Sequence, residues 1–134
     1  MLKALSVAMI VFGAIGILFG LGDIIAPDQS SKLFGFAEAP DFVNWVAALG
    51  GASYLASGVW VIVASRDPVR HILWVKFLIT KSWLFTLVTA YTILRGYVSF
   101  SQVGVLLVLF AIFGILFLAF YPWPPKASAR QTPA

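Results

Sequence analysis

The sequence predicts an all-α integral membrane protein, a bundle of four transmembrane helices with both termini in the cytoplasm. Hydrophobic residues make up 61% of the 134 residues and charged residues 10%, whereas a soluble domain carries about 25% charged residues. The charged residues also separate apolar runs of the length, about 20 residues, that crosses the hydrocarbon core of a bilayer. Three of these runs, 4–22, 42–65 and 96–125, are uncharged, and in a fourth, 71–94, the charged residues are Lys76 and Lys81.

Helix signals mark the first two spans, which we expect at 2–26 and 42–64. The first span ends before Pro27, because proline has no N–H with which to continue a helix. Asp41 follows Pro40 and suits the N-cap position of the second span, where a carboxylate accepts hydrogen bonds from free backbone N–H groups. The segment between the two spans, 27–41, is predicted to be a short amphipathic loop at the outer membrane surface.

The last two spans are expected at 68–95 and 100–121. Asp67 and Pro68 are typical of a cap followed by proline at the first helical position. Ser99 and Gln102 fit a capping box for the fourth span, and Pro122 ends it. The transmembrane domain therefore covers residues 1–125, and the polar tail 126–134 is expected to be a disordered cytoplasmic segment.

Lysine and arginine counts in the short loops predict the orientation, because basic loops stay on the cytoplasmic side. The side that holds both termini and the turn between the second and third spans carries five basic residues, Lys3, Arg66, Arg70, Lys126 and Arg130. The other side carries two, Lys32 and Arg95. Both termini are therefore predicted to be cytoplasmic.

Small residues predict how the first two spans pack. Helices in a membrane associate by close contact of small side chains, because lipid tails are as apolar as leucine. Gly16 and Gly20 stand in a GxxxG spacing, and the second span has alanine at intervals of four, at Ala48, Ala52 and Ala56. We expect these faces to pack against each other, with a homodimer through the Gly16/Gly20 face as the alternative.

Lys81 is the residue of the spans that most needs an explanation. A helix that begins at Pro68 places Lys81 about 20 Å along its axis, near the middle of the hydrocarbon. A lysine at that depth is expected to face the bundle interior and to find polar partners. The second span runs in the opposite direction, so Ser53, Tyr54 and Ser57 lie at the depth of Lys81 and form a candidate intramembrane polar site with it. For Lys81, a structural contact and a functional site both remain open. Lys76 lies closer to the cytoplasmic surface and can extend its ammonium to the headgroups.

Motifs for catalysis, metals and cofactors are missing from the sequence. The chain has no cysteine and one histidine, His71, too few ligands for a zinc or haem site. The glycines lie inside apolar helices rather than between a strand and a helix, so they do not form a phosphate loop. The basic residues are scattered between apolar runs, which argues against nucleic acid as a partner. We therefore expect no enzymatic activity, no metal and no cofactor.

Several short motifs resemble the DoxX-like small four-helix membrane proteins of bacteria. In order, they are Ala26-Pro27, Leu-Phe-Gly-Phe at 33–36, Ala-Leu-Gly-Gly at 48–51, Arg-Asp-Pro at 66–68 and a basic residue inside the third span. Members of that group often have arginine in the third span, where this chain has Lys81, so the role of that arginine is not carried over. The resemblance implies a multi-pass protein of the bacterial inner membrane and no specific activity.

The functional hypothesis from the sequence is a non-enzymatic small membrane protein that serves as an accessory subunit or binding module of a membrane complex. Besides the lipid bilayer, its expected partner is another membrane protein or a second copy of the chain. The alternative is a small oligomeric transporter or channel in which Lys81 belongs to an anion or proton pathway.

Overall fold

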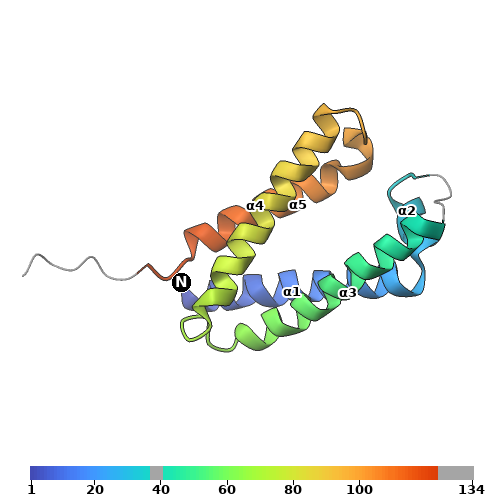
Figure 1. Ribbon diagram of the computed structural model, residues 1–134. Helices are drawn as coiled ribbons and strands as arrows, with labels where there is room; N and C mark the ends of the chain where they lie inside the picture. Colours follow the sequence, from blue (N-terminus) through green and yellow to red (C-terminus); the bar gives the residue numbers. More distant parts are fainter. Residues whose placement is uncertain (37–40, 124–134) are drawn as a thin grey trace, which may run out of the picture.

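The computed structural model of the protein describes residues 1–36 and 41–123, and this part of the chain is all-helical (Figure 1). Five helices follow one another: α1 Leu2–Ile25, α2 Pro27–Leu33, α3 Asp41–Ala64, α4 Ile72–Leu94 and α5 Phe100–Ala119. The predicted tail 126–134 and the last two residues of the predicted domain lie outside the described residues. Of the described helices, α1, α3, α4 and α5 are long and apolar enough to cross a membrane.

The four long helices form two antiparallel pairs, α1 with α3 and α4 with α5 (Figure 1). The pairs meet at the end of the bundle that holds the N-terminus and the turn 65–71, which we call the terminal end. They diverge toward the opposite end, where α2 and the turn 95–99 lie, and which we call the α2 end. The two ends of the bundle are therefore packed differently, and this asymmetry determines where a cavity can form.

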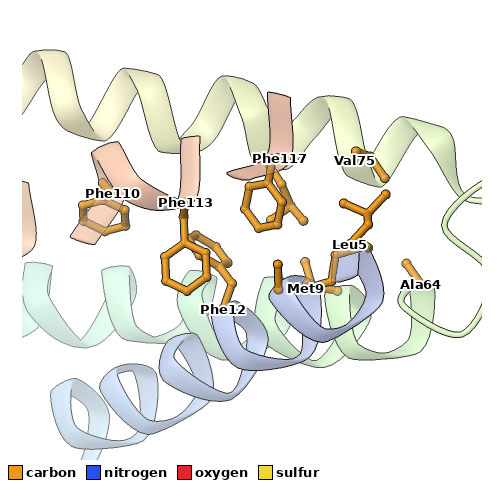
Figure 2. Close-up of a cluster of buried hydrophobic side chains, with 11 residues drawn as sticks. Leu5, Met9, Phe12, Ala64, Val75, Phe110, Phe113 and Phe117 are labelled. Carbon is orange, nitrogen blue, oxygen red and sulfur yellow. The ribbon is translucent and has the colours of Figure 1, made fainter. Parts of the chain in front are cut away.

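The apolar core fills the half of the bundle at the terminal end (Figure 2). Its buried side chains come from all four long helices: Leu5, Ala8, Met9, Phe12, Val61, Ala64, Val75, Leu78, Phe110, Phe113 and Phe117. The Phe12 ring of α1 makes edge contacts with three rings of α5, those of Phe110, Phe113 and Phe117, at centroid distances of 6.4, 5.0 and 5.5 Å. Such aromatic pairs contribute about 0.5–1.5 kcal/mol each, so Phe12 is a main contact between the two helix pairs.

Two glycines end helices at the α2 end. Gly35 after α2 and Gly96 after α4 have positive φ angles of 73° and 71°. At α4, the N–H of Gly96 donates to Ile93 O at 2.9 Å and the N–H of Tyr97 donates to Thr92 O at 3.0 Å. This is the Schellman arrangement, in which a left-handed residue lets the last carbonyls of a helix find donors.

The described helices differ from the sequence prediction by more than two residues at two places. The first half of the segment 27–41, expected as an amphipathic loop, forms α2 (Pro27–Leu33), with Pro27 in its first turn, and residues 37–40 lie outside the described residues. The third span begins at Ile72 rather than at Pro68. Residues 67–71 form a separate turn, in which the N–H of Arg70 donates to Asp67 Oδ1 at 3.0 Å. Because His71 has φ −102° and ψ 37°, this turn cannot continue directly into α4.

Glycines rather than alanines form the contact between α1 and α3. A Cβ atom at Gly20 would lie 2.6 Å from Gly51 O, and one at Gly58 would lie 2.7 Å from Gly13 O. The pairs Gly13/Gly58 and Gly20/Gly51 therefore mark the places where the two backbones approach most closely. Gly16 also faces α3, 3.4 Å from Tyr54 O by the same measure.

The alanine stripe expected in this contact has a different position. Ala52 and Ala56 are exposed on the bundle surface, and Ala48 is half-buried. Successive residues are about 100° apart around a helix, so residues seven apart share a face. Gly51 and Gly58 satisfy that spacing, and Ala52 and Ala56 are consequently turned away from α1.

Candidate functional site

Lys81 connects the two helix pairs near the middle of the bundle. Its Nζ, on α4, donates a hydrogen bond to Ser57 Oγ, on α3, at 2.8 Å. Ser57 Oγ in turn donates to Tyr54 O at 3.2 Å. The ammonium also lies 4.8 Å from the centroid of the Tyr54 ring and within 6 Å of the rings of Phe77 and Phe85. Cation–π contacts of this kind contribute about 0.5–2 kcal/mol each.

The partners of Lys81 are neutral throughout the described ranges 1–36 and 41–123. One hydroxyl and three aromatic rings contact its ammonium, and no carboxylate of these ranges does. Asp23, the nearest acidic residue within a span, accepts a hydrogen bond from Ser30 Oγ instead. Lys81 is thus held as a cation–hydroxyl–ring contact between α3 and α4 and not as an ion pair.

The candidate polar site contains three of the four residues expected from the sequence. Lys81, Tyr54 and Ser57 come together, whereas Ser53 is exposed and donates to Leu49 O at 3.3 Å. Ser53 lies one turn, about 6 Å, from Ser57 along α3 toward the α2 end, where the helix pairs diverge (Figure 1), so it does not join the contact with α4. Its hydroxyl is satisfied by its own helix, as is common for serine in apolar surroundings.

Lys76 is separate from this site. It is exposed, on a face of α4 that it shares with Thr80. Near the terminal end it lines a shallow surface depression together with Tyr121 and Trp123 of the segment after α5. This position agrees with a lysine whose stem lies along apolar surface while its ammonium extends toward water.

A cavity that the sequence did not predict lies inside the bundle where the helix pairs diverge. It has a volume of about 110 Å³ and is walled by α1, α3, α5 and the residue after α2. Five aromatic side chains line it: Phe12, Phe19, Phe34, Tyr54 and Phe110. We call this cavity the aromatic pocket. Asp23 also lines it and is the one charged residue of its wall.

Asp23 is placed in the aromatic pocket by the end of α1 and by α2. It is the third-last residue of α1, and Ser30, one turn into α2, holds its Oδ1 by a hydrogen bond. The break at Pro27 lets α2 fold back, so that Phe34 stacks on Phe19 of α1 at a centroid distance of 6.0 Å. The tertiary fold of this corner, rather than a local motif, therefore brings the carboxylate and the rings together.

A vestibule with both apolar and polar lining residues lies next to the aromatic pocket at the α2 end. Phe19 and Phe34 line both spaces, and Ser99, Ser101 and Gln102 of the α5 N-terminus line the vestibule. Gln102 Nε2 donates to Gly35 O at 3.3 Å, which ties the end of α2 to α5. The stacked pair of Phe19 and Phe34 consequently separates the aromatic pocket from a space that opens to the surface.

Two buried polar atoms of α4 have no hydrogen-bond partner, Ser82 Oγ and Trp83 Nε1. The Trp83 indole lies against α5, where a Cβ at Gly114 would be 3.2 Å from Trp83 Nε1. Neither atom lines the aromatic pocket. We therefore assign these residues to the packing of α4 on α5 and not to the site.

No group of three or more His, Asp or Glu side chains that could hold a metal ion occurs in residues 1–36 and 41–123. The sequence matches no protein-family model, and comparisons with the curated proteins and with the solved structures give no match. The aromatic pocket and the Lys81 contact are therefore the features of the described chain that bear on function.

Proposed function

We propose that this chain is a non-enzymatic binding module of a membrane complex and that the aromatic pocket is its binding site. The observation that carries the proposal is a cavity of about 110 Å³ inside the bundle, walled by five aromatic rings and one carboxylate. Binding sites are typically concave and mostly apolar, with a few polar groups that orient the ligand. The Lys81 contact belongs to the same module as a structural contact, because it holds α4 to α3 beside Tyr54.

The distribution of basic residues and the resemblance to DoxX-like proteins support a location in the bacterial inner membrane, with both termini in the cytoplasm. Because the chain has no cysteine, single cysteines at exposed Arg66 and Tyr97 would report the orientation. A membrane-impermeant maleimide applied to intact cells should label Tyr97→Cys and should label Arg66→Cys only after permeabilisation. The reverse pattern would show that the predicted orientation is inverted.

Native mass spectrometry in mild detergent tests the binding proposal. Leu106→Trp adds a large ring to the wall of the pocket, whereas Ile115→Trp adds the same ring at a residue of α5 that is 57% exposed. The wild type and Ile115→Trp should carry the same bound molecule or partner subunit, and Leu106→Trp should lose it. If the wild type binds nothing in cells and in detergent, or if both variants behave alike, the pocket is not the binding site.

The second candidate is a transporter or channel that uses Lys81 in an anion or proton pathway. It is favoured by one observation, a lysine near the middle of α4 whose partners in the described chain are all neutral. A water-filled pathway would make Lys81→Cys reactive toward water-soluble methanethiosulfonates and would give ion flux in proteoliposomes. A helix contact, which we favour, predicts an unreactive cysteine and no flux.

A further inference from the structure

The wall of the aromatic pocket contains one acidic residue and no basic residue. Asp23 lines the pocket and accepts a hydrogen bond from the neutral hydroxyl of Ser30. The pocket wall contains no lysine or arginine. The Lys81 ammonium lies against the Tyr54 ring and donates to Ser57, and Lys81 is not a residue of the pocket wall.

The rings add to the same electrostatic preference. The face of an aromatic ring is negative, so rings attract cations that lie over them. The wall has one carboxylate, no lysine or arginine, and four rings besides that of Tyr54, which the Lys81 ammonium already contacts. This lining favours a cationic guest and disfavours an anionic one. A small metal ion is a poor fit, since the wall has one carboxylate and no group of further acidic or histidine ligands was found in residues 1–36 and 41–123.

We infer that the aromatic pocket binds an organic cation of the quaternary ammonium class, with the charge beside Asp23 and the methyl groups against the rings. This inference rests on the proposed function, because it specifies the ligand of the same pocket. Quaternary ammonium groups are recognised in proteins by cages of aromatic side chains. Their charge is spread over methyl groups, so entry into an apolar cavity costs less desolvation than for a primary ammonium.

The size and the access of the pocket agree with such a guest. The volume of about 110 Å³ is of the same order as the engineered cavity of about 150 Å³ that binds benzene, so a group of the size of trimethylammonium can fit. The vestibule on the other side of the stacked Phe19 and Phe34 opens to the surface. Because Ser99, Ser101 and Gln102 line this vestibule, we assign the cation to water and not to a lipid headgroup.

Calorimetric titration of the full chain in a non-ionic detergent tests the inference, with choline as the probe. Its neutral isostere, 3,3-dimethyl-1-butanol, has the same shape without the charge. We expect choline to bind and the isostere to bind at least about tenfold more weakly. Asp23→Asn should weaken choline binding at least about tenfold, a factor that corresponds to about 1.4 kcal/mol. Asp67→Asn is the matched control and should leave binding unchanged, because Asp67 is exposed at the terminal end and an asparagine oxygen can still accept from the Arg70 N–H.

A second variant keeps the test valid if Asp23→Asn alters folding. Phe19→Leu keeps the wall apolar but removes one ring face, and it should weaken choline binding about 2- to 30-fold. Tyr91→Leu removes an exposed ring of α4 and should have no effect. Equal binding of choline and its isostere, or equal effects of the pocket and control variants, would overturn the inference.

Added phosphatidylcholine separates the two sources of the cation. Unchanged choline affinity supports a water-borne ligand, and competition would overturn that assignment in favour of a lipid headgroup. If choline fails to bind while Leu106→Trp still loses the native occupant, the ligand class is wrong and the binding module stands. If Leu106→Trp changes nothing, the proposed function itself fails.

Discussion

The closest backbone contact between α1 and α3 leads to a quantitative prediction for Gly20→Ala. The new Cβ would lie 2.6 Å from Gly51 O and 2.7 Å from Leu55 N, whereas a carbon and an oxygen in contact are about 3.3–3.6 Å apart. Both clashing atoms belong to the backbone, so no side-chain rotation relieves the clash. The helices must therefore separate by several tenths of an ångström to about 1 Å at this point.

Separation of that size costs free energy because the neighbouring contacts lose attraction. A gap of 0.5–1 Å forfeits about a quarter to a half of the dispersion energy of each contact, and insertion of an extra methyl group into a packed interior costs about 1–3 kcal/mol. Alanine is the better helix former by about 0.5–1 kcal/mol, but this gain is small in a bilayer, where the unfolded reference state retains its helices. We expect Gly20→Ala to lower the free energy of unfolding by about 1–2 kcal/mol.

Reversible unfolding in mixed micelles of mild detergent and sodium dodecyl sulfate measures this change. Gly22→Ala is the matched control, because a Cβ at Gly22 meets nothing within 4 Å. Gly51→Ala should cost about as much as Gly20→Ala, since its Cβ would lie 2.7 Å from Gly20 O. The double variant should cost less than the sum, because the first separation makes room for the second methyl group. If Gly20→Ala unfolds like Gly22→Ala, the close contact of α1 and α3 does not exist.

Three further predictions concern α4. In a double-mutant cycle, Lys81→Met and Ser57→Ala should show a coupling free energy of about 0.6 kcal/mol, the average for hydrogen bonds within membranes. The control cycle of Lys76→Met with Ser57→Ala should show no coupling. Equal coupling in both cycles would contradict the Lys81 contact. Gly96→Ala should lower the free energy of unfolding by about 1–2 kcal/mol, the cost of the left-handed conformation for alanine. No steric clash adds to this cost, because a Cβ at Gly96 meets no atom within 4 Å. An unchanged stability would show that α4 does not need this cap. Trp83→Phe should leave the free energy of unfolding unchanged or raise it by up to about 1 kcal/mol, because it removes a buried N–H that has no acceptor. A decrease of more than about 1 kcal/mol would indicate that the indole N–H has an acceptor.

Much of the candidate polar site could be predicted from the sequence. Apolar length and alternating direction place Lys81 and Ser57 at one depth, and the hydrogen bond between them follows from that register. Depth alone did not exclude Ser53, because Ser53 lies only one turn from Ser57 along α3 and about 40° from it around the helix. Which of the neighbouring hydroxyls faces α4 is decided by the rotation of α3, and that rotation depends on its contact with α1.

The aromatic pocket was not predictable by the same means. Asp23 stood near the end of an apolar run, without a ligand motif around it. Its relation to Phe34 and Tyr54 arises because α2 folds back after Pro27 and because the helix pairs diverge at the α2 end. Neither the fold-back angle nor the divergence has a sequence signature, since both result from packing between segments that are far apart in the chain.

The sequence by itself determined the four long helices: apolar runs of membrane-spanning length, the break at Pro27, the capping box at Ser99 and Gln102, and the position of Lys81 along its helix. Only the tertiary structure decided which faces meet, so that Gly51 and Gly58 pack on α1 while Ala52 and Ala56 are exposed. In a soluble protein an apolar stripe reveals the buried face of a helix. In a span that lipid surrounds, the outward face is as apolar as the inward one, so the rotation of each helix is fixed by close packing and polar contacts and not by the hydrophobic pattern.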